Sequence, residues 1–125
     1  MMKALLICLM MMAGTAVAQD APVYVAGVSG VPLMPGLTEL EDETVVFDKP
    51  GGRIVDAVAT GAMPTDQVLT YYSEALDVYG WIDAVPEIAD GLIVMREGEV
   101  LHLRIREAEG GVRVHYSLAP YRAKP

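Results

Sequence analysis

The clearest pattern of apolar and polar residues is a strict alternation near the end of the chain. It runs from Val100 to Glu107 and resumes from Val112 to Leu118, after the turn sequence Ala108–Gly111. A period of two is typical of a strand with one buried face, so the two segments predict a β-hairpin. We expect its apolar positions to face the core and its polar positions to face solvent. The core-facing set is Leu101, Leu103, Ile105, Val112, Val114, Tyr116 and Leu118.

A helical period appears between Asp66 and Tyr79. Its apolar residues fall on one stripe of a helix, and polar residues take the other face. The stripe consists of Val68, Tyr72, Ala75, Leu76 and Tyr79. Thr65 is placed to cap the first turn, and Gly80 to end the helix in a left-handed conformation. The spacing therefore predicts an amphipathic helix over residues 66–79.

Shorter apolar runs predict the remaining strands. Residues 44–47 and 53–60 flank the turn sequence Asp48–Gly52 and predict a first hairpin. Residues 81–85 and 92–96 add strands after the helix. A sheet with one apolar face needs another element to cover that face, and the single predicted amphipathic helix is the candidate. We therefore expect an α+β two-layer sandwich, with an antiparallel sheet of about five to six strands in the order ββαββββ.

The first eighteen residues have the layout of a secretory signal peptide. Lys3 precedes an apolar run from Ala4 to Ala13, and Ala16–Ala18 forms an A-x-A cleavage site. The run is shorter than the about 20 residues that span a bilayer. We predict cleavage after Ala18 and a periplasmic or secreted protein without a transmembrane span. The alternative is a retained membrane anchor. A lipoprotein is disfavoured because Cys8, the single cysteine, lies inside the apolar run.

The remaining chain suits one domain. Residues 19–43 are rich in proline, glycine and small residues, which predicts an extended lead-in or linker, docked at most around 31–33. Residues 44–120 contain every predicted strand and the helix, and residues 121–125 form a tail. Loss of Cys8 with the leader leaves no cysteine, so packing rather than disulfides must stabilise the fold.

The charge of the chain argues against one class of partner. It has 9 basic and 17 acidic residues, and removal of Lys3 with the leader takes the net charge from −8 to −9. An acidic domain repels phosphate backbones, so no nucleic-acid partner is expected. Six of the basic residues nevertheless follow residue 91, where the second hairpin presents several of them to solvent.

The solvent face of that hairpin holds the candidate binding residues, which are Arg104, Arg106, Arg113 and His115. A turn centred on Glu109–Gly110 places Arg106 opposite Arg113. Like charges directly opposite destabilise a sheet, so their presence favours a face that holds an anion. An anionic envelope component or an acidic protein partner fits such a face.

Other interpretations of this face compete with anion binding. Acidic residues between positions 39 and 43, or those of the 97–99 turn, can neutralise the arginines, and solvent can do the same. His102 and His115 lie diagonally on neighbouring strands, as zinc ligands can. Arg104 beside them repels a metal ion, so we expect neither a metal nor another cofactor.

A pocket between helix and sheet is the alternative site. Tyr71 and Trp81 are the aromatic residues suited to line it, as a small-ligand carrier or an enzyme requires. Their other interpretation is a place in the core. The sequence has no G-x-S-x-G motif, no phosphate-binding glycine loop and no H-E-x-x-H motif, which favours a non-enzymatic protein.

The segment Thr65–Tyr72, with Leu76 and Gly80–Trp81, resembles a pattern of small exported bacterial envelope proteins, in which such a helix ends in Gly-Trp before β-hairpins. It is similar to the compact α+β domains of outer-membrane assembly lipoproteins, over residues 44–118. The resemblance implies a fold and carries no catalytic residue. This chain lacks their lipid-bearing cysteine at the cleavage site. We predict an exported binding or scaffolding protein, whose partner is an envelope protein or an anionic envelope component.

Overall fold

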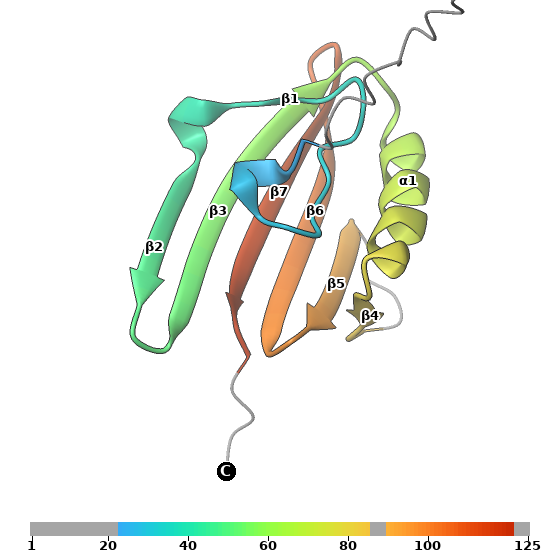
Figure 1. Ribbon diagram of the computed structural model, residues 1–125. Helices are drawn as coiled ribbons and strands as arrows, with labels where there is room; N and C mark the ends of the chain where they lie inside the picture. The colour runs from blue at the N-terminus through green and yellow to red at the C-terminus, as the bar shows by residue number, and fades with distance from the viewer. Residues whose placement is uncertain (1–22, 86–89, 122–125) are drawn as a thin grey trace, which may run out of the picture.

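The computed structural model describes residues 23–85 and 90–121. These residues form an α+β fold, in which one α-helix packs against a seven-stranded antiparallel sheet (Figure 1). The strands are β1 (Thr38–Glu39), β2 (Val45–Lys49), β3 (Gly52–Gly61), β4 (Ile82–Asp83), β5 (Gly91–Arg96), β6 (Glu99–Ala108) and β7 (Gly111–Pro120). The helix α1 is Thr65–Val78, and the short 3-10 helices are η1 (Val25–Gly27) and η2 (Glu41–Glu43). The predicted signal peptide lies outside the described residues.

The strands follow the order β1-β3-β7-β6-β5-β4, and β2 also pairs with β3. Both β1 and β2 lie along the same edge of β3, since Thr38 faces Thr60 and Val45 faces Asp56. The strands β1 and β2 therefore form one edge of the sheet, and η2 lies between them in the chain. After β3, α1 carries the chain to the far edge of the sheet, and β4 to β7 return as a meander (Figure 1).

The predicted α+β class and the antiparallel sheet packed against one amphipathic helix are confirmed. The predicted strand number was too low, because β1 has two residues and no alternation to reveal it. Thr65 is not the helix cap: Pro64 takes that position without a side-chain hydrogen bond. Gly80 ends the helix as predicted, with a φ of +87° that favours glycine, and Trp81 N–H donates to Leu76 O.

The core lies on the face of the sheet that α1 covers. From α1 it takes Val68, Tyr72 and Leu76, and from β6 and β7 it takes the alternate residues that the sequence predicted. The pairing of β6 with β7 also has the predicted register, with Arg106 opposite Arg113. Two alternating strands joined by a short turn leave little freedom of register, because a shift by one residue exchanges their faces.

The segment 23–37, which we call the N-terminal cover, packs on this face beside α1. The prediction of an extended lead-in or linker was therefore wrong for these residues. The N-terminal cover lies over β3 and its neighbours (Figure 1). Its buried residues are Val25, Val28, Val31, Met34 and Leu37. The domain therefore begins before residue 44. An α-helix is roughly 10 Å wide and strands are about 4.8 Å apart, so one helix covers only two or three strands of this sheet.

Buried hydrogen bonds join the two covers to the sheet. Tyr72 Oη donates to Pro32 O at 2.8 Å, accepts from Met34 N–H at 3.2 Å and lies 2.6 Å from Tyr116 Oη. Since the single Tyr72 proton goes to Pro32, Tyr116 is the donor between the two hydroxyls. Burial raises the pKa of Tyr72 to about 12 and also raises the pKa of Tyr116.

Candidate functional site

The helix α1 and the segment 23–37 both lie on one face of the sheet (Figure 1), and we call the opposite face the open face. The strand register decides which side chains lie there, because directly opposite residues share a face. Asp56 and Val58 on β3 share it with Ser117 and His115 on β7. Val58 is buried and yet stands outside the core cluster, which agrees with a place on this second face.

One half of the open face is polar, and carboxylates partner most of its cations. Arg113 forms an ion pair with Glu43 of η2, and Arg106 Nε lies 3.6 Å from an oxygen of Asp90. Asp56 Oδ1 lies 3.2 Å from His115 Nε2. Three of the four predicted binding residues therefore each have an acidic neighbour. Only Glu43 belongs to the acidic residues that the sequence offered as partners, whereas Asp90 and Asp56 do not.

Ser117 and Arg104 complete the polar half. Ser117 Oγ donates to the Asp56 oxygen that also faces His115, at 3.0 Å. Arg104 lies opposite His115 and has no ion-pair partner within the described ranges. Burial, followed by the charge of Arg104, lowers the pKa of His102, so this imidazole is mostly neutral at pH 7. Ser117 is not arranged as a catalytic nucleophile, because its hydroxyl donates to Asp56 and not to a histidine that could act as the base.

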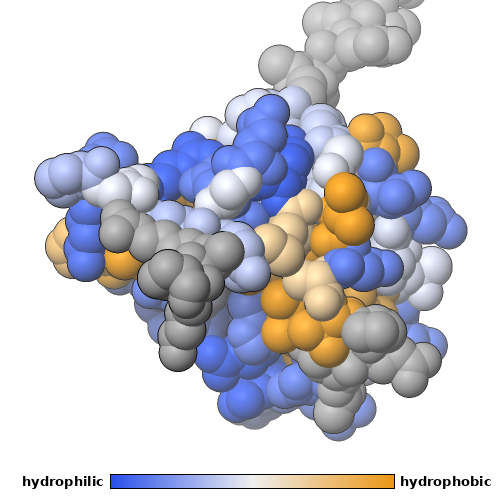
Figure 2. All heavy atoms as spheres, turned by 90° about the horizontal axis from the view of Figure 1, so that it is seen from below, coloured by the Kyte–Doolittle hydropathy of each residue, from blue (hydrophilic) through white to orange (hydrophobic). Residues whose placement is uncertain are grey.

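The other half of the open face is an apolar row that crosses the sheet at one end. The pairings that build it are Phe47 with Ile54, Val100 with Ala119, Met95 with Val100, and Ile82 with Met95. The row ends on Phe47 at one edge, which is 57% exposed, and on Ile82 at the other, which is 72% exposed. Figure 2 views this end of the molecule, where apolar atoms gather over β2 at the left and over β4 and β5 right of centre.

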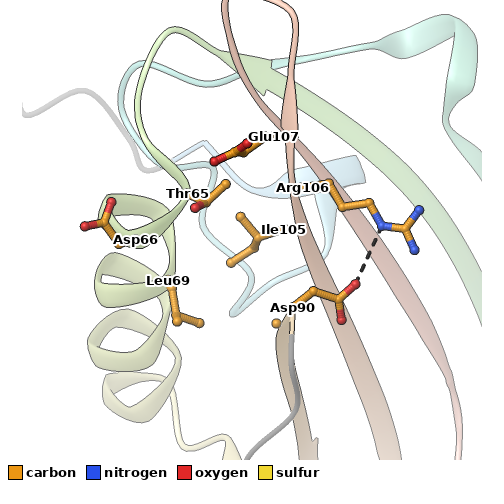
Figure 3. Close-up of a pocket in the computed structure, with 8 residues that line it drawn as sticks. Thr65, Asp66, Leu69, Asp90, Ile105, Arg106 and Glu107 are labelled. Carbon is orange, nitrogen blue, oxygen red and sulfur yellow. Dashed lines mark ion pairs between the residues drawn. The ribbon is translucent and has the colours of Figure 1, made fainter.

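A separate cavity of about 420 Å³ lies between the first turn of α1 and the strands β5 and β6. In Figure 3, Leu69 and Ile105 point toward each other across it, whereas Arg106 turns away toward Asp90. Its polar lining is mainly acidic, with Asp66, Asp90 and Glu107. Gly91 also lines it, and a Cβ there would collide with the carbonyl oxygen of Leu103.

The two predicted pocket residues line different hollows. Tyr71 lies in an apolar groove of about 510 Å³ between α1 and the segment 23–37. Trp81 is 3% exposed and borders a hollow of about 370 Å³ beside β4 and β5. Its Nε1–H donates to Gly30 O at 2.9 Å, and the Arg96 guanidinium lies 4.6 Å from its ring centroid. These contacts tie the N-terminal cover to the end of α1, a structural role that sequence reasoning did not find.

The described residues offer neither a clustered metal site nor a membrane-spanning helix. Nowhere in residues 23–85 and 90–121 do three His, Cys, Asp or Glu side chains form a group able to hold a metal ion. Nor does any helix in these ranges have the length and apolar character required to cross a bilayer. Sequence reasoning missed the apolar row, although the run Val45–Phe47 contains three apolar residues without alternation.

No protein-family model matches this chain, and no curated protein or solved structure is significantly similar to it. The resemblance to outer-membrane assembly lipoproteins therefore stays a prediction.

Proposed function

We propose that this is an exported, non-enzymatic binding protein of the bacterial envelope, which holds another envelope protein against its open face. The observation that carries the proposal is the apolar row. A sheet with one face toward solvent normally turns polar residues to that side. Ile54 and Ala119 are the next positions beyond the last pair of β3 and β7, Val55 with Leu118, so six apolar side chains follow one line across the solvent side. Phe47 and Ile82 are exposed at its ends. An exposed apolar patch bordered by polar residues is typical of a protein-binding surface.

The charges of the open face favour a protein over an anionic polymer or lipid. Arg106 and Arg113 already face Asp90 and Glu43, and His115 faces Asp56. Within the described ranges this leaves Arg104 as the one arginine of the predicted set without a carboxylate partner, so the face has little positive excess to attract an anionic surface, and the whole chain is acidic. An apolar centre with a polar surround matches the composition of protein–protein interfaces.

Site-specific crosslinking in cells tests the proposal. A photoreactive phenylalanine analogue replaces Met95 on the open face or, as control, Glu74 on the exposed side of α1. We expect one defined envelope protein to crosslink through position 95 and not through position 74. Ile82→Asp should abolish that product, while Val78→Asp, at an 82% exposed helix position, should not. Equal products from both positions, or none from position 95, would contradict the proposal.

An anionic partner is tested by replacing Arg104, Arg106 and Arg113 together by serine. Under our proposal, wild type and variant are retained equally on anionic vesicles and on purified peptidoglycan. Charge contacts at an exposed face are screened over about 8 Å at physiological ionic strength, so the comparison is made at low and moderate salt. Retention of wild type alone at low salt would identify an anionic component as the partner and overturn the proposed protein partner.

Export is the part of the proposal that rests on residues 1–18. Mass spectrometry of the protein from its native host should find Gln19 at the N-terminus. A cytoplasmic pool that retains Met1 would contradict export.

A second candidate function is the binding of a small molecule in the cavity beside α1. Its volume of about 420 Å³ lies within the usual range of ligand sites. The acidic lining of Asp66, Asp90 and Glu107 favours a cationic amine. A diamine should then raise the unfolding temperature of wild type, and Asp66→Asn should reduce that shift. The absence of any shift in wild type would remove this candidate.

A further inference from the structure

The outer edge of β2 is an open strand edge with unusual side chains. Within the described residues, β2 pairs with β3 on one side and has no neighbour on the other. All five of its residues are exposed, including Val45 at 43%, Val46 at 51% and Phe47 at 57%. Natural sheets usually protect such an edge with charges, proline or a bulge in the strand. In β2 the charges come only at the end of the strand, as Asp48 and Lys49, and its first three residues have no such protection.

The hairpin that carries this edge is held in position. Arg53, at the start of β3, makes two hydrogen bonds of 3.0 Å to the carboxylate of Glu99 on β6. Bidentate arginine–carboxylate pairs add geometric specificity as well as attraction. The edge is therefore ready to accept a strand without first being ordered.

The side chains of β2 are compatible with a second copy of the same strand. In an antiparallel pair about a two-fold axis normal to the sheet, opposite residues have the same parity and share a face. Val45 and Phe47 of both copies then meet on the open face, because both lie there with Asp56 and Ile54. With Val46 opposite Val46 of the second copy, each Val45 lies opposite a Phe47. Aromatic and β-branched residues form favourable cross-strand pairs.

The charges at the ends of β2 select the same orientation. The strand follows the acidic turn Glu41–Glu43 and ends with Lys49. An antiparallel pair brings Lys49 of each copy to the acidic turn of the other. A parallel pair would place the two acidic turns together, and like charges repel. The strand is thus complementary to itself in one direction only.

We infer that two copies of this protein associate through β2, in antiparallel register, to form a continuous sheet. Five residues from each copy make a smaller contact than a standard interface, so the dimer should be weak and concentration-dependent. The inference does not rest on the proposed function. It is argued from the unpaired edge of β2, whereas the proposed function is argued from the open face.

Cysteine crosslinking tests the predicted register. In full-length protein with Cys8→Ser, Val46→Cys places two thiols opposite each other at the two-fold axis. Directly opposite residues have Cα atoms about 4.5–5.5 Å apart, which a disulfide can bridge. We expect mild oxidation to give a covalent dimer. Val78→Cys, at a more exposed helix position, should remain monomeric under the same conditions.

Sedimentation equilibrium of the protein without added cysteines provides a second readout. We expect wild type to dimerise as its concentration rises, and Phe47→Lys and Lys49→Glu to weaken dimerisation at least tenfold. Ile82→Asp, at the opposite edge, should leave it unchanged. Equal crosslinking of Val46→Cys and Val78→Cys, or a wild type that stays monomeric throughout, would overturn the inference. A Val46→Cys variant that crosslinks only to a different protein, and forms no covalent homodimer, would also overturn the inference.

The failures of the two proposals can be told apart. Lys49→Glu, in β2 but outside the apolar row, should weaken dimerisation and leave the Met95 crosslink to an envelope protein in place. A variant that loses the Met95 crosslink but still dimerises would bear only on the proposed function of the open face and not on the dimer.

Discussion

Tyr116 and its chain neighbours His115 and Ser117 form similar hydrogen bonds on opposite faces of β7. The Tyr116 hydroxyl meets Tyr72 in the core, where both tyrosines are almost inaccessible to water. His115 and Ser117 share one oxygen of Asp56 on the open face, where all three side chains are partly exposed. Water can replace a hydrogen bond lost on the open face, but it cannot do so in the core.

The difference shows which face stabilises the fold and which is free for binding. On the covered face, the buried side-chain polar atoms of the described residues all have partners. Its hydrogen bonds join α1, the segment 23–37 and the sheet into one core. On the open face, the contacts are half-exposed ion pairs, which contribute about 0–1 kcal/mol each. Substitutions on the two faces should therefore separate stability from binding.

The largest effect is expected from Leu76→Ala on the covered face. Leu76 is 1% exposed, and truncation of a buried leucine costs about 2–5 kcal/mol through lost burial and a cavity. Val78→Ala, two residues further along the same helix, should stay within about 0.5 kcal/mol of wild type. Urea denaturation measures both. Similar values for the two variants would contradict the assignment of the covered face as the core.

Removal of the Tyr72 hydroxyl should have the next largest effect. In Tyr72→Phe, Pro32 O loses its donor and Met34 N–H loses its acceptor. Unsatisfied buried groups cost about 1–3 kcal/mol. Tyr116→Phe should cost less, because it removes one donor and leaves Tyr72 bonded to the N-terminal cover. If thermal denaturation gives the opposite order, the contacts of the Tyr72 hydroxyl with Pro32 and Met34 do not stabilise the fold as described.

The same two tyrosines should make the protein sensitive to alkaline pH. Their pKa values are raised in the folded state, to about 12 for Tyr72, whereas an unfolded tyrosine titrates near pH 10. Above about pH 10 the unfolded chain loses protons that the folded chain retains. The free energy of unfolding should fall by about 1.4 kcal/mol per pH unit for each tyrosine. Tyr72→Phe should reduce this slope when urea denaturation is repeated across the range.

The smallest change in stability is expected from Asp56→Asn on the open face. It weakens the contacts with His115 and Ser117, and both partners can bond to water instead. We expect less than about 1 kcal/mol in urea denaturation at pH 7. A loss as large as that of Tyr72→Phe would mean that the open face is not accessible to water and would remove the comparison between the two faces.

The sequence alone determined the elements whose patterns are local. The alternation in β6 and β7 predicted which residues face the core and, with the short turn, their register. The stripe around Tyr72 and Leu76 predicted the covered side of α1, and Gly80 predicted its end. Such patterns are readable because the period of a helix or strand is fixed by backbone geometry within one segment.

The N-terminal cover was readable in part. Its buried residues Val25, Val28, Val31, Met34 and Leu37 occur at every third position, a period that matches neither an α-helix nor a strand. Glycine and proline between them gave the segment the composition of a linker. The need for a second cover became evident from the width of the sheet, which depends on how all the strands assemble.

Only the tertiary structure decided the chemistry of the open face. Glu43 and Asp90 come to Arg113 and Arg106 from segments distant in sequence, and Asp56 comes to His115 from β3. The apolar row likewise takes its members from five strands and the edge strand β2. No local period records which segments become neighbours, because that choice follows from packing the sheet as a whole.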